Sequence, residues 1–246
     1  MKKIVTFILS LCFMLSALLA FSACKESVDD PSAEQNPKHE HTFGDGTLLL
    51  PATEETGVTE ISTCTECGEK SETLIPFSKT TEEKWRAMLL PKNYTVTISY
   101  GTGDKGLYTV TEDGYSLQDV SRGVSLFFVK EDDGWYKVSF EDGEYVSSKI
   151  AIAPKLSLGD LIMPGMDAEF DNFVYSEEWS AYVHERPGTN KYFIYTAGDT
   201  LVRIIGFGGE ALENVTPSSE PSDEYSVFIF DFHDYGTTTL DVPDYR

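Results

Sequence analysis

The chain has 246 residues, with 41 Asp and Glu against 19 Lys and Arg, so its formal net charge is −22 at pH 7. This acidity disfavours non-specific binding to nucleic acid or to anionic lipid surfaces, and no nucleic-acid partner is expected. The chain has only four cysteines, which excludes a scaffold built on many disulfide bonds. The aromatic content of 13% is high enough to fill a hydrophobic core.

Residues 1–23 have the three parts of a secretion signal. A basic start at Lys2 and Lys3 precedes an uncharged apolar run, and small residues then lead to Cys24. The stretch resembles bacterial lipoprotein signals, with Phe21 as a departure from the usual aliphatic residue. The resemblance implies that Cys24 receives diacylglycerol, which places the protein on the extracytoplasmic face of the cell membrane as a lipid-anchored protein. A plain secretory peptide and an uncleaved anchor helix remain as alternatives.

Two short segments follow the signal. Residues 24–38 are polar and acidic with almost no apolar side chains, so we expect a disordered linker. Residues 39–76 contain turn residues and short β-prone runs, and we expect a small β ribbon module there. The module is too small to be stable on a hydrophobic core alone.

Residues 77–246 form the main predicted domain. A short helix is expected from Ser78 to Leu90, where Trp85, Met88 and Leu89 have helical spacing and Pro91 ends the pattern. Strands follow, separated by Asp-Gly and Gly-Asp turns that are typical of antiparallel hairpins. Their predicted ranges are 94–100, 107–112, 124–130, 135–140, 144–150, 172–185, 191–196, 200–207 and 225–233.

The last strand is apolar on both faces. Phe228, Phe230 and Phe232 alternate with Tyr225, Val227 and Ile229. An antiparallel sheet commonly leaves one face in water, so apolar side chains on both faces predict a curved sheet with one face on a helix or lid and the other on a cavity or second layer. The expected fold class is mainly β with one or two short helices: a curved antiparallel sheet, or incomplete β-barrel, plus the ribbon module. Residues 154–171 are irregular and could form a short helix or lid.

The ribbon module carries a metal-ligand pattern. His39 and His41 precede a Cys64-Thr65-Glu66-Cys67 knuckle by about two dozen residues, and two such pairs can supply the four ligands of a structural zinc. The stretch resembles a short module of extracytoplasmic Firmicutes proteins, in which a cysteine stands where this chain has His39. A Cys64–Cys67 disulfide and free thiols remain open as alternatives.

Catalytic motifs are weak. His184 stands alone, and His233 follows Asp231 without a nucleophile motif to accompany them. No phosphate-binding loop or dinucleotide fingerprint is present. We therefore expect no catalytic residues and no enzyme activity, and we interpret the His233 region as a polar cluster at the end of a strand.

The main domain resembles the lipoprotein-carrier half-barrel family, which includes periplasmic lipoprotein carriers and anchored lipid-binding lipoproteins. The resemblance rests on an apolar strand that contains Arg203, and on the closing pattern from Phe230 through Asp234-Tyr235-Gly236 to Pro243. It implies an incomplete barrel wrapped around helices, with an apolar cavity for acyl chains. The expected function is binding of a lipid or acyl chain by a membrane-anchored lipoprotein. The alternative is a non-catalytic structural or protein-interaction module of the cell envelope, and the ligand-binding residues are not identifiable from the sequence.

Overall fold

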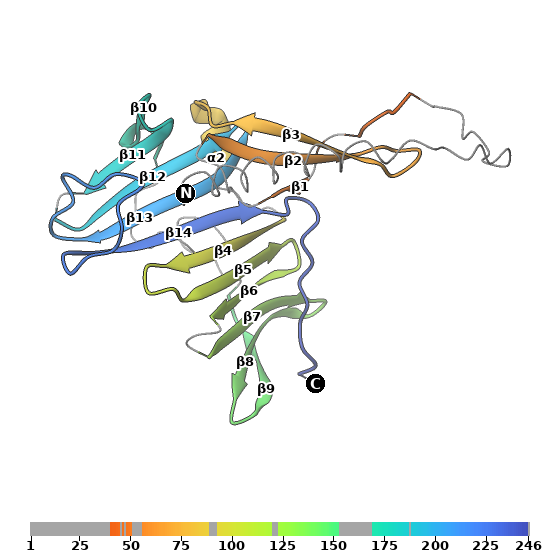
Figure 1. The fold of residues 1–246 in the computed structure, drawn as a ribbon. Coiled ribbons are helices and arrows are strands. Elements are labelled where there is room, and N and C mark those ends of the chain that lie inside the picture. The colour runs from red at the N-terminus through yellow and green to blue at the C-terminus, as the bar shows by residue number, and fades with distance from the viewer. Residues whose placement is uncertain are drawn as a thin grey trace, which may run out of the picture. The chain divides into compact units, whose positions relative to one another are not determined.

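The computed structural model (Figure 1) describes residues 40–44, 46, 48–50, 56–88, 93–119, 123–152, 169–186 and 188–245. The predicted signal peptide, Cys24, the linker and His39 lie outside these ranges, as does most of the irregular segment 154–171. Residues 41–246 form one compact unit. No helix within the described ranges has the length and hydropathy needed to cross a membrane.

One large antiparallel sheet of 11 strands dominates the fold. Its strands are β4 (Tyr94–Tyr100), β5 (Lys105–Thr111), β6 (Gly114–Asp119), β7 (Val124–Glu131), β8 (Gly134–Glu141), β9 (Glu144–Ile150), β10 (Val174–Ser176), β11 (Ala181–Arg186), β12 (Asn190–Ala197), β13 (Thr200–Gly209) and β14 (Tyr225–His233).

The strand order is β10-β11-β12-β13-β14-β4-β5-β6-β7-β8-β9. Each neighbouring pair is consecutive in the chain except β14 and β4, which join the last strand of the sheet to its first. The sheet is therefore two runs of hairpins connected at their centre, with β9 and β10 as its outermost strands. It is curved and does not close into a barrel, which confirms the predicted fold class (Figure 1).

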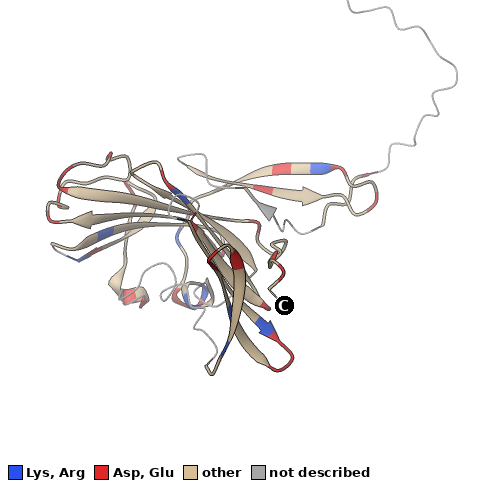
Figure 2. Ribbon diagram, turned by 90° about the horizontal axis from the view of Figure 1, so that it is seen from below, with Lys and Arg blue, Asp and Glu red and all other residues tan. Residues whose placement is uncertain are grey.

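Two helical segments, α2 (Glu82–Met88) and the 3-10 turn η1 (Phe170–Asn172), lie inside the curve of the sheet (Figure 2). Trp85 is only 3% exposed, and the centroid of its ring lies 4.6 Å from that of Phe173 and 5.5 Å from that of Tyr182. A seven-residue helix is not stable in isolation, so this aromatic packing holds α2 in place. The concave core continues onto the sheet through alternate residues of β4 and β14, Tyr94, Val96, Ile98, Phe230 and Phe232 among them.

A second core lies on the opposite, convex face. It contains Phe193, Val202, Phe207 and Val227 from the large sheet, with Tyr225 and Ile229 packed against it. The two faces of β14 therefore belong to two different cores, as its two-sided apolar pattern predicts.

The small sheet contains β1 (Leu48–Leu49), β2 (Gly57–Thr63) and β3 (Lys70–Pro76), all antiparallel. Val58 of β2 and Phe77, the residue after β3, are both buried in the convex core. The chain then runs beside β12, because the N–H of Ser78 donates to the carbonyl of Thr196 at 2.9 Å. The end of the ribbon at Val58 and Phe77 is thus anchored in the core of the main sheet, which compensates for the ribbon's lack of a core of its own.

Several predicted boundaries change. The single strand expected over residues 172–185 was wrong: η1, β10 and β11 occupy this range, with a turn at residues 177–180 that has no Gly, Pro, Asn or Asp to mark it. Ser180 supplies the required left-handed backbone with φ of 48°. Strand β6 was not predicted. By contrast, the predicted Asp142-Gly143 turn is confirmed, with positive φ at both residues as a tight hairpin turn requires.

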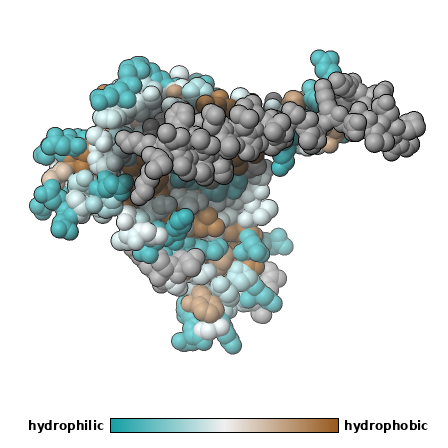
Figure 3. All heavy atoms as spheres, in the orientation of Figure 1, coloured by the Kyte–Doolittle hydropathy of each residue, from teal (hydrophilic) through white to brown (hydrophobic). Residues whose placement is uncertain are grey.

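The acidic residues lie mainly at turns and strand ends, as Figure 2 shows. Asp132 and Asp133 are exposed in the turn between β7 and β8, and Glu141 and Asp142 are exposed in the next one. Hydrophilic residues are also prominent on the face of the molecule seen in Figure 3. The large negative charge is therefore mostly solvated surface, as its placement in the sequence indicates.

Candidate functional site

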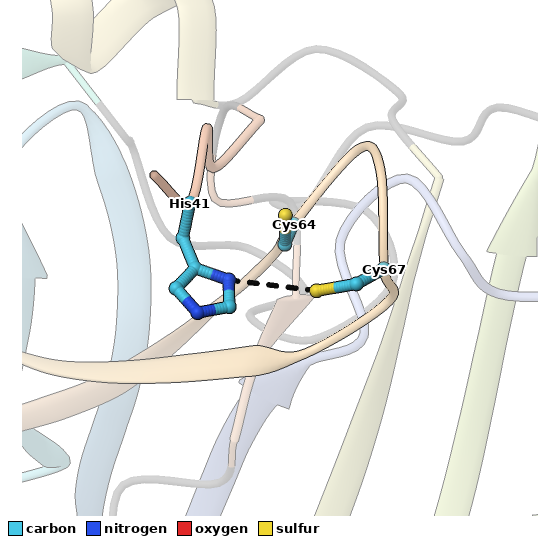
Figure 4. Close-up of side chains that lie close together, drawn as sticks. All are labelled: His41, Cys64 and Cys67. Atoms are coloured by element: carbon cyan, nitrogen blue, oxygen red, sulfur yellow. Dashed lines mark hydrogen bonds between the residues drawn. The ribbon is translucent and has the colours of Figure 1, made fainter. Parts of the chain in front are cut away.

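Three of the predicted metal ligands come together at one end of the ribbon (Figure 4). Cys64 follows β2, and Cys67 lies in the tight turn that leads to β3. The turn is closed by the N–H of Gly68, which donates to the carbonyl of Cys64 at 3.0 Å, and Gly68 has φ of 75°. The segment that carries His41 is held beside this turn, because the N–H of Thr65 donates to the carbonyl of Thr42 at 3.0 Å.

The spacing of the ligand atoms suits a metal ion. The Nδ1 of His41 and the Sγ of Cys67 are 3.4 Å apart, and the candidate ligand atoms of all three residues lie within 4.8 Å of one another. Tetrahedral zinc with ordinary bond lengths separates a sulfur and a nitrogen ligand by about 3.6 Å. His41, Cys64 and Cys67 are therefore close enough to bind a metal together.

Both cysteines carry thiol groups in this structure, Cys64 buried and Cys67 exposed. The pKa of the Cys67 thiol is raised above its ordinary value. A backbone hydrogen bond from Glu69 lowers this pKa, but desolvation, the neighbouring Cys64 and the negative charge of Glu69 together raise it by more.

A residue not singled out in the sequence also belongs to this site. The carboxylate of Glu69 lies 3.2 Å from the Nε2 of His41, on the side of the ring away from Cys67. The signal that could have identified it is its place directly after Cys67-Gly68, where the turn brings the chain back toward His41. His39, the fourth predicted ligand, lies outside the described residues.

The second candidate site is the concave face beyond the helices. Along its centre, Tyr108, Leu117 and Leu126 are cross-strand partners on β5, β6 and β7, and the same row continues through Ser139 to Val146 on β9. A parallel row begins with Val110, Tyr115 and Phe128. We call this surface the apolar strip and define it by Tyr108, Tyr115, Leu117, Leu126, Phe128 and Val146.

The apolar strip is largely buried near the helices and exposed to solvent further away. Tyr108 and Phe128 pack against the concave core, and the rings of Tyr115 and Phe128 stack with centroids 4.6 Å apart. Burial raises the pKa of Tyr115 to about 12, with a further contribution from Tyr108, which shows that this hydroxyl is poorly solvated. At the far end Val146 is 40% exposed.

Polar and charged residues also lie on this face. On β8, Ser139 and Lys137 are the cross-strand partners of Leu126 and Phe128, and on β6 the buried Asp119 lies two residues after Leu117. The strip is therefore apolar from β5 to β7, and β8 separates this part from Val146 on β9.

The predicted polar cluster at the end of β14 lies on the convex face. His233 is buried, with its Nε2 2.9 Å from the hydroxyl of Thr97 and its Nδ1 2.7 Å from the carboxylate of Asp234. Asp231 instead forms an ion pair with Arg203 at 2.6 Å. The cross-strand contact with Thr97 was not predicted, because it depends on the pairing of β14 with β4, which are far apart in the sequence.

Open grooves accompany this cluster and the ends of the central strands. One groove, of about 520 Å³, is lined by His233, Asp234 and threonines of β4, β5 and the C-terminal segment. Thr97 is not among its lining residues. Another, of about 620 Å³, lies where β4 and β14 end, beside Tyr100 and Tyr225. Both grooves are open and have mixed polar and apolar walls.

No protein-family model, curated protein or solved structure matches this chain.

Proposed function

We propose that this protein binds a hydrophobic ligand, a lipid or an acyl chain, on the apolar strip of its concave face. The observation that carries the proposal is the row of apolar side chains formed by Tyr108, Leu117 and Leu126 on β5 to β7, which extends the concave core beyond α2 and η1. Beyond Ser139 of β8, the same row ends at Val146 on β9. The resemblance to half-barrel lipid-binding lipoproteins supports the same ligand class.

The chemistry of the strip suits an acyl chain. Such a ligand needs a dry aromatic and aliphatic surface and no specific hydrogen-bonding or catalytic group. Transfer of each methylene group from water to such a surface contributes about 0.8 kcal/mol. A chain lying along several strands could therefore be retained through purification.

A pair of neighbouring substitutions tests the position of the ligand. Val146 and Ser147 are both exposed on β9, and successive strand residues face opposite sides of the sheet. Val146→Glu places a carboxylate on the apolar strip, so we expect about tenfold weaker binding of a fluorescent fatty acid, equivalent to losing about two methylene contacts. Ser147→Glu adds the same charge to the convex face and should leave binding unchanged. Equal effects of the two substitutions would place the ligand elsewhere.

We also propose that His41, Cys64 and Cys67 bind a structural zinc. The support is the 3.4 Å separation of the Cys67 sulfur and the His41 Nδ1, together with a donor set that zinc prefers. His39 is the fourth ligand that the sequence predicts. Metal analysis of the purified protein should give one zinc per chain, and Cys67→Ser should lose it; zinc retained in full by Cys67→Ser would contradict this donor set.

The proposed place of action is the extracytoplasmic face of the membrane, with the chain anchored through lipid on Cys24. The support is the order of basic, apolar and small residues before Cys24. Cys24→Ala should release the protein from the membrane fraction. If the variant stays with the membrane, another segment holds it there.

The alternative function is a protein-interaction module of the cell envelope, and the open sheet favours it in one respect. Val174 on the outermost strand β10 is 71% exposed, and an outermost strand can pair with an added strand from a partner. Val174→Lys would weaken binding to such a partner and leave lipid binding unchanged. A purified protein that contains no lipid but binds an envelope protein through β10 would favour this alternative.

A further inference from the structure

Glu69 contacts two of the three candidate metal ligands, through a different group in each case. Its carboxylate lies 3.2 Å from the Nε2 of His41. Its carbonyl accepts a hydrogen bond from the N–H of Cys64 at 2.7 Å. Glu69 therefore connects the histidine of the proposed site to one of its cysteines.

We infer that Glu69 is the positioning residue of the proposed zinc site, and this inference rests on the zinc site proposed above. The two ring nitrogens of His41 face different groups: Nδ1 faces Cys67, and Nε2 faces Glu69. A carboxylate on Nε2 fixes the tautomer in which Nε2 carries the proton and Nδ1 keeps the lone pair that binds metal.

The position of the Glu69 carboxylate also excludes it as a direct metal ligand in this arrangement. The Nδ1 and Nε2 lone-pair directions diverge from the ring, so a carboxylate on Nε2 lies on the far side of His41 from a metal held by Nδ1 and the two sulfurs. Glu69 therefore acts through His41, as carboxylates commonly do behind metal-binding histidines.

The backbone contacts of Glu69 have a second consequence. They survive any change of its side chain, so Glu69→Gln isolates the contribution of the carboxylate. Glu66 lies in the same turn, between the two cysteines, and its side chain is exposed. Glu66→Gln therefore removes the same charge from the same turn and serves as the matched control.

The experiment measures zinc affinity by competition with a chromophoric chelator, for the unaltered protein and for both variants. We expect Glu69→Gln to weaken zinc binding about tenfold, at the lower end of the usual effect because the carboxylate is 61% exposed. Glu66→Gln should change the affinity less than twofold. Nitrogen-15 spectra of the imidazole rings should show a protonated Nε2 on His41 in the zinc-bound unaltered protein.

The outcomes separate this inference from the zinc site itself. A lack of zinc binding by the unaltered protein overturns both. If the unaltered protein and Glu69→Gln bind zinc tightly and equally, the positioning role alone is overturned. Equal losses of zinc affinity in Glu69→Gln and Glu66→Gln also overturn it, because they would indicate a simple charge effect. A His41 ring that binds zinc through Nε2 also contradicts the inference.

Discussion

Zinc binding should stabilise the whole of residues 41–246, although the proposed site lies at one end of the ribbon. Val58 and Phe77 are buried in the same convex core as strands of the main sheet, and Phe77 forms a bridge with Ala197 of β12. The ribbon and the sheet should therefore unfold together. A ligand present at a hundred times its dissociation constant stabilises the folded state by about 2.7 kcal/mol. For a unit of this size that corresponds to a rise in Tm of about 5–10 °C.

Thermal unfolding followed by near-ultraviolet circular dichroism, with added zinc and with chelator, measures this effect. His41→Ala should abolish the difference between the two conditions, and His184→Ala, which changes a histidine of the main sheet, should preserve it. The reasoning is refuted if chelator leaves the main transition unchanged. A separate ribbon transition that alone responds to zinc would refute the shared core.

Three further predictions concern the two faces of the sheet. Trp85→Ala should lower the free energy of unfolding by about 3–5 kcal/mol in urea, because it removes the buried ring that attaches α2 to the concave core; Arg86→Ala, on the exposed side of α2, should cost less than about 1 kcal/mol, and similar losses from both would contradict the packing. Burial raises the pKa of Asp231, although Arg203 and His233 act to lower it. The folded state therefore holds the proton of the Asp231 carboxyl more tightly than the unfolded state does. The contribution of Asp231 to stability should be greatest below about pH 4 and fall as the pH rises. Asp231→Leu alone should lower the free energy of unfolding by about 3 kcal/mol, because it removes the carboxylate that pairs with Arg203. Asp231→Leu combined with Arg203→Met should leave the free energy of unfolding in urea nearly unchanged. An equal loss in the single and the double variant would contradict this account.

Local patterns in the sequence predicted much of the fold because they depend on short-range geometry. The alternation from Tyr94 to Tyr100 gave the bounds of β4 as the structure has them, and the two-sided pattern of β14 predicted a core on each face. Strand β6 has no β-branched residue, and the turn before β11 has Ser180 but no Gly, Pro, Asn or Asp, so the local signal for each was weak.

Local sequence patterns could not predict contacts between segments that are far apart in the chain. The pairing of β14 with β4 brings His233 to Thr97, and nothing in either segment alone indicates that register. The ribbon site is an intermediate case. The spacing of its histidines and cysteines predicted that His41, Cys64 and Cys67 lie together, but the contact between Glu69 and His41 depends on how the turn folds back.

The lipid content of the protein tests the central proposal most directly. The full chain should be purified from membranes in mild detergent and its organic extract analysed by mass spectrometry, with Val146→Glu and Ser147→Glu prepared in parallel. The proposal predicts a defined lipid or fatty acid in near-stoichiometric amount, depleted in Val146→Glu and retained in Ser147→Glu. Extracts without lipid beyond the anchor proposed on Cys24, from protein whose binding of a fluorescent fatty acid is also absent, would contradict it.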